Sequence, residues 1–366
     1  MASISWENAL VLQTSFLGDT VLTLPLLAEI KRRFPVKKLT LLCNPLGKEL
    51  LQGHPAIDEI IVDDKRGADS GLGGLLRQAA LLKTRAFTLA LTPHKSMRTA
   101  LMLYFAGIPC RVGFRQSRGW FLFHRRVVRD LRRHDVERNL SLLEAFDLPI
   151  EECELGIDLP VRPNVEESVD RLLRSLGVSS NRLIIGVNPG SVWATKRWSP
   201  ASFARLITLL AQRYDCQVLL FGGPEDAAVV AKIQESCAVP TIDLAGRTGL
   251  GELPAVISRC QVFVTNDSGP MHVAVARKVS TVAIFCATTP AQGFFPYSAN
   301  AIVIEKALDC RPCASHGGRR CPLGTEDCMR LIHPEQVLRA VEKLLRLQEK
   351  APVTPANPYQ PEFVTI

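Results

Sequence analysis

The feature that most constrains the fold of this chain is a repeated alternation of short apolar segments with segments of helical spacing. Such an alternation is typical of βαβ units, which build a parallel sheet covered by helices. In the first half, strands are predicted at 9–13, 39–43, 59–62 and 88–91, and helices at 21–33, where Pro25 breaks the helical spacing, and at 74–85. The first half therefore predicts a doubly wound α/β domain.

The alternation fades between residues 148 and 165 and then starts again, which predicts a second domain of the same class. Pro149, Pro160 and Pro163 interrupt the pattern, so this stretch is the predicted linker. In the second half, strands are predicted at 183–188, 217–221, 241–244, 262–265 and 281–285, and helices at 201–214, 225–236, 253–259, 269–276 and 334–348. A length of 366 residues also exceeds one typical core.

The predicted architecture consists of two Rossmann-like, doubly wound α/β domains that face each other across a cleft. Residues 1–160 form the first domain and residues 161–348 the second. Residues 349–366 are rich in proline and are expected to form a flexible tail.

The net charge of +8 favours an anionic partner. Much of the positive charge lies between Arg111 and Arg138, although this stretch could equally be a solvated basic face. It contains no recognised nucleic-acid-binding motif, so nucleic acid is not expected as a partner. No segment is apolar over about 18 residues, which predicts no membrane-spanning helix. The N-terminus lacks the pattern of a signal peptide, and a cytoplasmic location is expected.

A polar loop follows the first predicted strand at residues 14–20. Ligands of open α/β sheets bind at the carboxyl ends of strands, where this loop lies. It matches neither a GxGxxG dinucleotide fingerprint nor a GxxxxGKS/T phosphate loop, which disfavours both chemistries. Its Asp19 is a candidate general base for an attacking hydroxyl. From the loop alone, helix capping by Asp19 is the simpler interpretation.

Residues 188–198 form a second polar loop, after the first strand of the second half. Its hydroxyl residues and two cations suit a diphosphate leaving group. Lys196 would neutralise the charge that grows as a glycosyl–phosphate bond breaks. A basic surface turn is the alternative, which the two tryptophans and the strand-end position disfavour.

Residues 266–272 form a third polar loop, between a strand and a helix. The backbone N–H groups at a helix N-terminus bind anions, although Asp267 or Ser268 could serve only as an N-cap. Glu225, at another strand end, could bind the two hydroxyls of a ribose or merely favour the helix dipole. Capping does not explain why all three polar loops follow strands, so the loops together predict one site.

The last four of the eleven cysteines lie close together, as Cys310-x2-Cys313-x7-Cys321-x6-Cys328. Four thiolates bind a zinc or iron ion well, and a metal would stabilise a loop with so few apolar residues. A reducing cytosol disfavours two disulfides, and four free thiols are the remaining alternative. Because this loop lies far from the polar loops in the sequence, we expect a structural and not a catalytic metal.

Together these motifs resemble the ADP-heptose:lipopolysaccharide heptosyltransferases of glycosyltransferase family 9, and the heptosyltransferase II branch most. The resemblance covers about residues 9–345. It rests on Gly18-Asp19 with Leu24-Pro25, on residues 105–109 with Arg111, Gly113 and Arg115, and on residues 189–191, 195–198, 221–223, 244–248 and 266–272.

This resemblance implies a GT-B fold, with the acceptor on the first domain and ADP-heptose on the second. It implies that Asp19 is the base, that Lys196 and Thr195 hold the diphosphate, and that the reaction inverts the anomeric centre without a catalytic metal. The other implied donor-binding residues are Glu225, Asp267, Ser268, Gly269 and His272. Ser191 is included as a hydroxyl of the Lys196 loop, although residues 191–194 lie where the family varies.

The implied acceptor is the inner core of lipopolysaccharide, which is acidic. The predicted acceptor-binding residues are Lys95, Arg98, Arg115 and Arg118, because cations, and arginine above all, bind carboxylates and phosphates. Since lipid A lies in a membrane, peripheral contact with the cytoplasmic face of the inner membrane is expected.

Two alternatives share the same motifs. One is a family member that uses another nucleotide sugar or a protein acceptor. The other is a non-catalytic nucleotide-sugar-binding protein, which the presence of Asp19 and Lys196 disfavours.

Overall fold

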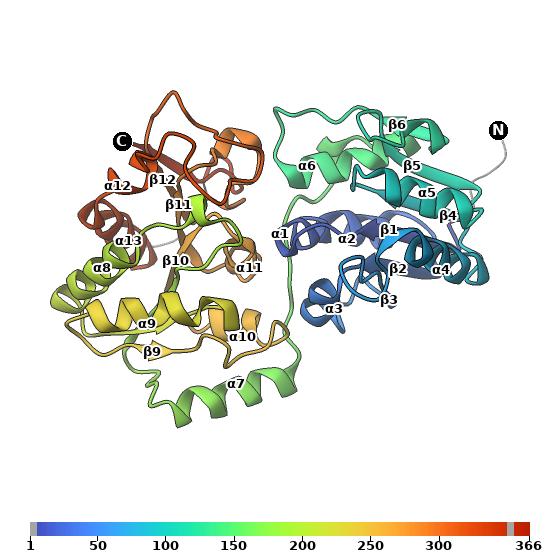
Figure 1. Ribbon diagram of the computed structural model, residues 1–366. Helices are drawn as coiled ribbons and strands as arrows, with labels where there is room; N and C mark the ends of the chain where they lie inside the picture. The colour runs from blue at the N-terminus through green and yellow to red at the C-terminus, as the bar shows by residue number, and fades with distance from the viewer. Residues whose placement is uncertain (1–5, 350–354) are drawn as a thin grey trace. The chain divides into compact units, whose positions relative to one another are not determined.

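The computed structural model describes residues 6–349 and 355–366, and the chain divides into two compact units. Unit 1 is Met1–Leu159 and unit 2 is Pro160–Ile366 (Figure 1). Each unit contains a parallel sheet flanked by helices. The predicted α/β class is therefore confirmed.

Unit 1 has a six-stranded sheet with the order β3-β2-β1-β4-β5-β6, in which every neighbouring pair is parallel. Its strands are β1 (Asn8–Gln13), β2 (Lys38–Cys43), β3 (Glu59–Val62), β4 (Leu89–Thr92), β5 (Cys110–Phe114) and β6 (Arg125–Val127). Its helices are α1 (Leu17–Val21), α2 (Leu24–Arg33), α3 (Pro45–Leu51), α4 (Gly71–Thr84), α5 (Met97–Phe105) and α6 (Asp135–Leu140). The strand order reverses between β1 and β4, which makes the loops after these strands the expected ligand-binding position.

Unit 2 has a seven-stranded sheet with the order β13-β12-β11-β10-β7-β8-β9, again parallel throughout. Its strands are β7 (Leu183–Asn188), β8 (Cys216–Leu220), β9 (Ile242–Asp243), β10 (Val262–Asn266), β11 (Ser280–Phe285), β12 (Ala301–Glu305) and β13 (Glu362–Thr365). Its helices are α7 (Pro163–Ser175), α8 (Pro200–Arg213), α9 (Ala227–Ser236), α10 (Leu253–Ile257), α11 (Gly269–Ala276), α12 (Asp327–Arg330) and α13 (Pro334–Gln348). Here the order reverses between β7 and β10.

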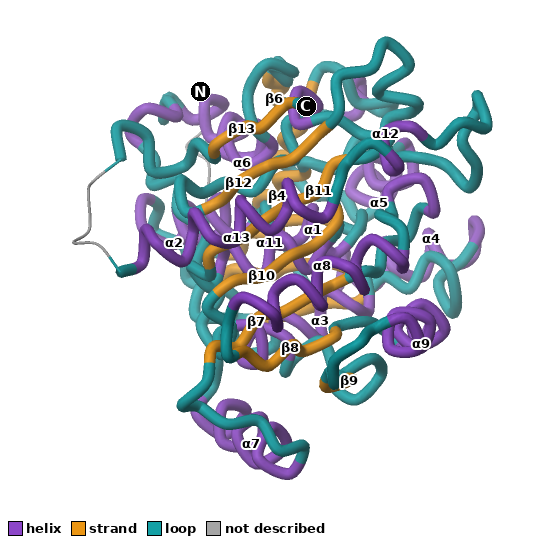
Figure 2. The backbone as a smooth tube through the Cα atoms, turned by 90° about the vertical axis from the view of Figure 1, so that its left-hand side faces the viewer, coloured by secondary structure: helices purple, strands orange, loops and turns teal. Residues whose placement is uncertain are grey.

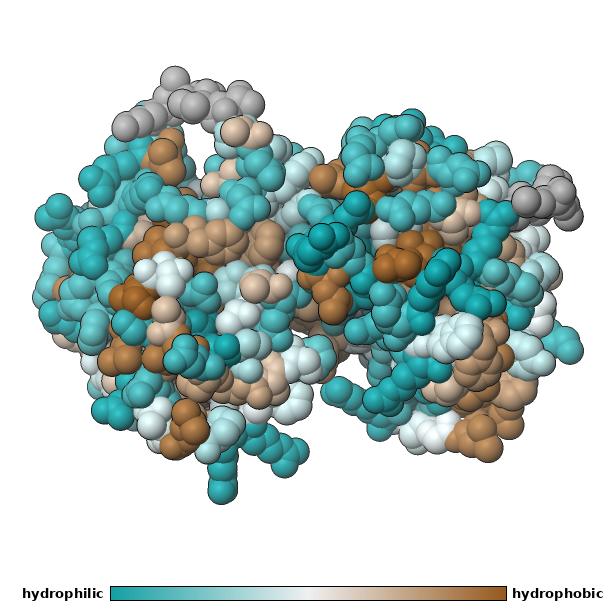
Figure 3. Space-filling view, turned by 90° about the horizontal axis from the view of Figure 1, so that it is seen from above, coloured by the Kyte–Doolittle hydropathy of each residue, from teal (hydrophilic) through white to brown (hydrophobic). Residues whose placement is uncertain are grey.

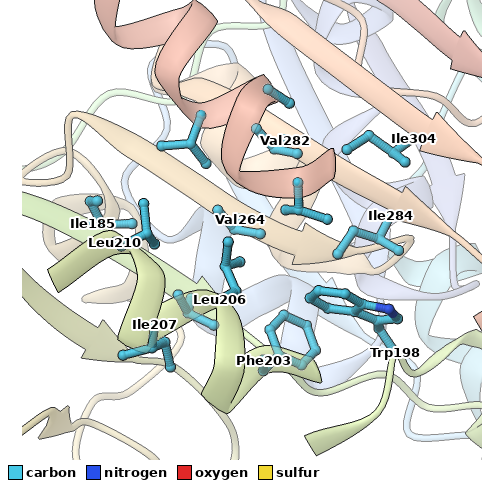
Figure 4. Close-up of a cluster of buried hydrophobic side chains, with 14 of the residues drawn as sticks. Ile185, Trp198, Phe203, Leu206, Ile207, Leu210, Val264, Val282, Ile284 and Ile304 are labelled. Atoms are coloured by element: carbon cyan, nitrogen blue, oxygen red, sulfur yellow. The ribbon is translucent and has the colours of Figure 1, made fainter. Parts of the chain in front are cut away.

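The core of unit 2 lies between its sheet and the helices α8 and α13. Strands β10 and β11 are buried along their whole length, as expected for central parallel strands. Trp198 and Phe203 meet edge to face at 5.0 Å inside this cluster (Figure 4). Cys328 and Ile332 belong to the same cluster, so the cysteine-rich segment ends in the core. None of the helices in the described part of the chain is long and apolar enough to cross a bilayer.

The C-terminal residues differ from the predicted flexible tail at 349–366. Residues 362–365 form strand β13, which pairs in parallel with β12 at the edge of the sheet (Figure 2). Two apolar side chains explain this, because Phe363 contacts Phe295 edge to face at 5.5 Å and Val364 packs against the core. The tail prediction is therefore wrong for these residues, and its part at 350–354 lies outside the described residues.

The predicted helical segment at 21–33, with its interruption near Pro25, corresponds to the last residue of α1 and the whole of α2. Helix α1 ends at Val21 and α2 begins at Leu24, with Pro25 in the first turn of α2. Proline is favoured there because the first N–H groups of a helix have no partner within the helix. The proline therefore starts a helix and does not bend one, which leaves α1 as a short separate helix that carries Asp19.

Candidate active site

Asp19 lies in α1, directly after the loop that follows β1. Its Oδ2 atom accepts a hydrogen bond from the backbone N–H of Phe16 at 3.1 Å, so the capping interpretation is correct as far as it goes. Capping does not exclude a second role, because a carboxylate has acceptor positions for several donors. The half-buried side chain also sits beside the reversal of strand order in unit 1, where a ligand is expected.

Two lysines lie within electrostatic range of Asp19. Burial lowers the pKa of Lys65, and the carboxylates of Asp63 and Asp19 oppose this shift. Burial likewise lowers the pKa of Lys95, and Asp19 again acts in the opposite direction. The Lys65 ammonium also donates to the hydroxyl of Thr14 at 3.4 Å. Lys65 was missed by sequence analysis because an isolated lysine after a short strand carries no motif.

His94, in the loop after β4, completes this side of the site. Burial, helped by the charges of Lys65 and Lys95, lowers the pKa of its imidazole to about 4. The ring is therefore neutral near pH 7. Its Nδ1 atom lies 2.8 Å from the Thr99 hydroxyl and 3.3 Å from the Thr14 hydroxyl. The loops after β1 and β4 are thus joined by hydrogen bonds at the position where the strand order reverses.

The four predicted acceptor-binding residues have different surroundings. Arg98 forms an ion pair with Asp63 at 2.8 Å and donates to the carbonyls of Asp69 and Gly71. These bonds hold the loop between β3 and α4, which gives Arg98 a structural role in the described chain. Arg115 and Arg118 have exposed side chains, and Lys95 is exposed in part but buried enough for its pKa to be lowered.

In unit 2, the loops after β7 and β10 are held together by side-chain amides. Asn266 accepts from the backbone N–H of Trp198 at 3.0 Å and donates to the carbonyl of Pro189 at 2.8 Å. Asn188 donates to the hydroxyls of Thr265 and Ser268 at 3.2 and 3.3 Å. Two of the predicted polar loops therefore form one structure at the carboxyl edge of the sheet.

Lys196 and Asp267 form an ion pair across these two loops. The Lys196 Nζ atom lies 2.6 Å from Asp267 Oδ2, which also accepts a hydrogen bond from Thr288 at 2.6 Å. The Lys196 and Asp267 side chains are only 13% and 7% exposed, so each charge needs the other to offset the free-energy cost of its burial. The ion pair therefore fixes Lys196, a predicted donor-binding residue, at the carboxyl ends of β7 and β10, where the strand order reverses, and close to the start of α11.

The start of α11 has the properties of an anion site. Ser268 occupies the N-cap position but makes no capping hydrogen bond, and Asp267 is engaged by Lys196, so capping does not account for either residue. His272 is buried, and burial lowers its pKa to about 4, so the ring is neutral near pH 7. Its Nδ1 atom has no hydrogen-bond partner among the described residues. A buried, unpaired ring nitrogen beside a lysine and helix N–H groups fits a polar ligand.

The loop after β8 contributes Asp226 as well as the predicted Glu225. Glu225 is exposed, whereas Asp226 is buried and burial raises its pKa. Asp226 accepts from the Gly223 N–H at 3.2 Å and packs so closely on Gly190 that a Cβ there would lie 2.3 Å from its Oδ2. Asp226 therefore fixes this loop against the Lys196 loop and leaves Glu225 at the surface.

The cysteine-rich segment lies next to this site, contrary to its separation in the sequence. Cys313 N–H donates to the carbonyl of Ala287, and Ala287 N–H donates to the carbonyl of Thr195. Cys310 is exposed and Cys328 is buried. Backbone N–H groups of residues 323–326, that of Glu326 first, lower the pKa of Cys321. Among residues 6–349 and 355–366, no three metal-binding side chains are grouped closely enough to hold an ion, so zinc or iron here stays a prediction.

Comparisons of the sequence and of the structure with known proteins identify relatives of one family. The family model described as glycosyltransferase family 9 (heptosyltransferase) matches residues 75–322. The chain is 30% identical to lipopolysaccharide heptosyltransferase 2 of Salmonella typhimurium, over 77% of this chain and 83% of that protein. Among solved structures, a family 9 glycosyltransferase from Veillonella parvula is 26% identical with a TM-score of 0.84, covering 94% and 98% of the two chains. The ADP-heptose lps heptosyltransferase II of E. coli is also 26% identical, with a TM-score of 0.75 and coverage of 94% and 100%.

Proposed function

This chain belongs to glycosyltransferase family 9 and is a glycosyltransferase, and we propose that it transfers L-glycero-D-manno-heptose from ADP-heptose to the inner core of lipopolysaccharide. The observation that carries the proposal is the anion site of unit 2. There Lys196, the first turn of α11 and the unpaired ring nitrogen of His272 come together at the position where the strand order reverses. The heptose and the lipopolysaccharide come from the names of the relatives.

The proposed reaction divides the chemistry between the two units. In unit 1, Asp19 takes the proton of an acceptor hydroxyl, whose oxygen then attacks the anomeric carbon. The bond from that carbon to the diphosphate breaks on the opposite face, so the configuration inverts, and ADP leaves with the bonding electrons. In unit 2, Lys196 and the N–H groups of α11 stabilise the negative charge that develops on the diphosphate.

The cations of unit 1 favour an acceptor that carries negative charge. Lys65 and Lys95 lie within coulombic range of Asp19, the proposed base. The same cations would bind carboxylates or phosphates of the acceptor. Arg115 and Arg118, which are exposed after β5, remain proposed acceptor-binding residues.

Transfer of one heptosyl group to a defined acceptor tests the proposed function. The purified protein is incubated with ADP-heptose and an acceptor, and the product is analysed by mass spectrometry. The acceptor is lipid A that carries one heptose on the acidic core sugar Kdo (3-deoxy-D-manno-octulosonic acid). We expect the acceptor to gain the mass of one heptosyl residue. Parallel reactions with UDP-, GDP- and other ADP-sugars serve as controls. A gain with another sugar only would overturn the heptose assignment, and no gain with any donor would overturn transfer to this acceptor.

We further propose that unit 1 makes peripheral contact with an anionic membrane surface. Exposed apolar side chains gather around the segment from α5 to β6 and the residues after it: Tyr104, Phe105, Trp120, Phe121, Val128 and Leu131. Figure 3 shows apolar side chains among polar ones on the face of unit 1 that it presents. The guanidinium of Arg126 stacks 5.1 Å from the Trp120 ring centre. Aromatic side chains between arginines suit the headgroup region of an anionic bilayer.

Replacing Phe121 by Ser should weaken binding to vesicles that contain phosphatidylglycerol by about 10- to 100-fold, because a buried Phe side chain contributes roughly 1.5–3 kcal/mol. Co-sedimentation at several salt concentrations measures this, and binding of the unchanged protein should fall as salt rises. Leu46→Ser is the matched control, since Leu46 is an exposed apolar residue at the start of α3. Equal loss in both variants would contradict a specific membrane-binding surface.

A further inference from the structure

Two glycines of the cysteine-rich loop, residues 310–328, lie directly against the loop that carries Lys196, residues 188–198. The Gly318 N–H donates to the Thr195 hydroxyl at 2.8 Å, and the Gly318 carbonyl accepts from the Thr195 N–H at 3.1 Å. Residue 318 thereby binds both the backbone and the side chain of the residue before Lys196. Segments more than one hundred residues apart in the sequence are joined here by a reciprocal pair of hydrogen bonds.

Gly317 leaves the space through which the Lys196 side chain passes. A Cβ atom on Gly317 would lie 2.9 Å from Lys196 Cγ, 3.2 Å from Lys196 Cδ and 3.2 Å from the Thr195 hydroxyl. The aliphatic stem of Lys196 therefore crosses over residue 317 before its ammonium reaches Asp267. Any larger side chain at 317 would push the stem or the loop away.

The cysteine-rich loop is fixed at both ends. At its start, the buried Arg311 guanidinium donates to the carbonyls of Phe285, Cys286, Thr288 and Lys306, and it pairs with Glu305 at 3.1 Å. At its end, Cys328 belongs to the core, as does Ile332 just beyond it, and the indole N–H of Trp198 donates to the carbonyl of Ile332 at 3.0 Å. Between these anchors, Gln292 donates to the carbonyls of Ala314 and Ser315. Hydrogen bonds and core packing therefore hold the loop in one position along its length.

We infer that this loop forms a wall of the nucleoside-diphosphate site, in which Gly317 and Gly318 are positioning residues that act through Lys196 and Thr195. The inference rests on the proposed function, since it requires Lys196 to bind the diphosphate. Gly317 sets the path of the Lys196 stem, and Gly318 sets the orientation of the Thr195 hydroxyl. Both effects concern donor binding and leave the acceptor side unchanged.

The test compares Gly317→Ala with Gly324→Ala in the full chain. Both glycines have a positive φ, +83° and +71°, so both substitutions introduce similar backbone strain. Only residue 317 contacts Lys196, whereas a Cβ on Gly324 meets nothing within 4 Å. We expect Gly317→Ala to weaken ADP binding, measured by calorimetry, by about 10- to 100-fold, because small displacements of a positioned group have effects of this size. Gly324→Ala should keep the affinity of the unchanged protein.

Steady-state kinetics separate positioning from general damage. Gly317→Ala should raise the KM for the donor and leave the KM for the acceptor unchanged. Combined with Lys196→Ala, it should add almost nothing to the loss caused by Lys196→Ala alone, because the two residues act through one contact. Equal ADP affinity in Gly317→Ala and Gly324→Ala, or full additivity with Lys196→Ala, would overturn the inference. Normal ADP affinity in Lys196→Ala alone would instead overturn the proposed donor site.

A second pair of variants applies if Gly317→Ala does not fold. Thr195→Ser keeps the hydroxyl that accepts from Gly318, and Thr195→Val keeps the shape but removes this acceptor. We expect ADP affinity to be retained in the Ser variant and reduced about tenfold in the Val variant, as for other buried hydrogen bonds that lose one partner. Unchanged affinity in Thr195→Val would overturn the role of Gly318.

Discussion

Replacing Asp19 by Asn is expected to lower the kcat of heptosyl transfer by about 10²- to 10⁴-fold, the usual contribution of a positioned general base. An amide cannot take the proton of the acceptor hydroxyl, so the attacking oxygen must lose it to water. The affinity for ADP should stay nearly unchanged, because the proposed diphosphate ligands, Lys196 and the first turn of α11, are not altered. Initial rates at saturating substrates, together with calorimetric titration of ADP, measure the two quantities separately.

The choice of Asn separates catalysis from helix capping. The Asn side-chain oxygen can still accept from the Phe16 N–H, so the first turn of α1 keeps its hydrogen bond. Asp19→Ala loses both the base and this bond, and should therefore be less stable than Asp19→Asn but no less active. If Asp19→Asn retains activity within a few-fold of the unchanged protein while Asp19→Ala loses it, then Asp19 only caps the helix.

Sequence analysis could predict the polar loops of the candidate site because their positions depend only on where the strands end. The polar residues at 14–20, 188–198 and 266–272 could be placed because each follows an apolar strand, and the structure shows that β1, β7 and β10 border the two reversals of strand order. Such a placement needs only the pattern of alternation. It does not reveal which hydrogen bonds form, and so it left the capping alternatives open for Asp19 and Ser268.

The contacts that sequence analysis missed are those made by side chains across long separations. Lys65 reaches Thr14 only because β3 and β1 end at the same edge of one sheet. Gly318 contacts Thr195 from a loop in which Arg311 donates to the carbonyls of Phe285 and Thr288, at and after the end of β11. Neither contact has a periodic signal in the sequence. Distance along the chain was therefore a poor reason to separate the cysteine-rich loop from the proposed donor site.

Arg98 and the C-terminal strand illustrate a second limit. Acceptor binding by Arg98 stays a prediction, but the sequence did not show that its guanidinium also pairs with Asp63 and donates to carbonyls of the neighbouring loop. Likewise, the prolines of residues 349–366 indicated a tail, but four residues with Phe363 and Val364 among them suffice to extend an existing sheet edge. In both cases composition describes the residues correctly, and only the structure shows their tertiary contacts.

The second large effect is expected for Lys196→Ala, which should weaken ADP binding by about 10- to 150-fold, equivalent to a hydrogen bond with a charged group worth roughly 1.5–3 kcal/mol. The same substitution leaves the buried carboxylate of Asp267 without its cation. Removing one partner of a buried ion pair lowers the free energy of unfolding by roughly 3 kcal/mol, and the hydrogen bond from Thr288 offsets only part of that loss. Weak binding in this variant could therefore reflect instability alone.

The double variant Lys196→Ala/Asp267→Asn distinguishes the two causes. Its neutral amide removes the unpaired charge and can still accept from Thr288, so the free energy of unfolding, measured with urea, should recover most of the loss. The affinity for ADP should not recover, because no cation faces the diphosphate. Recovery of both quantities would mean that Lys196 neutralises Asp267 and does not bind the donor. Recovery of stability alone makes the ammonium of Lys196 a direct ligand of the diphosphate, held in place in the free protein by the carboxylate of Asp267.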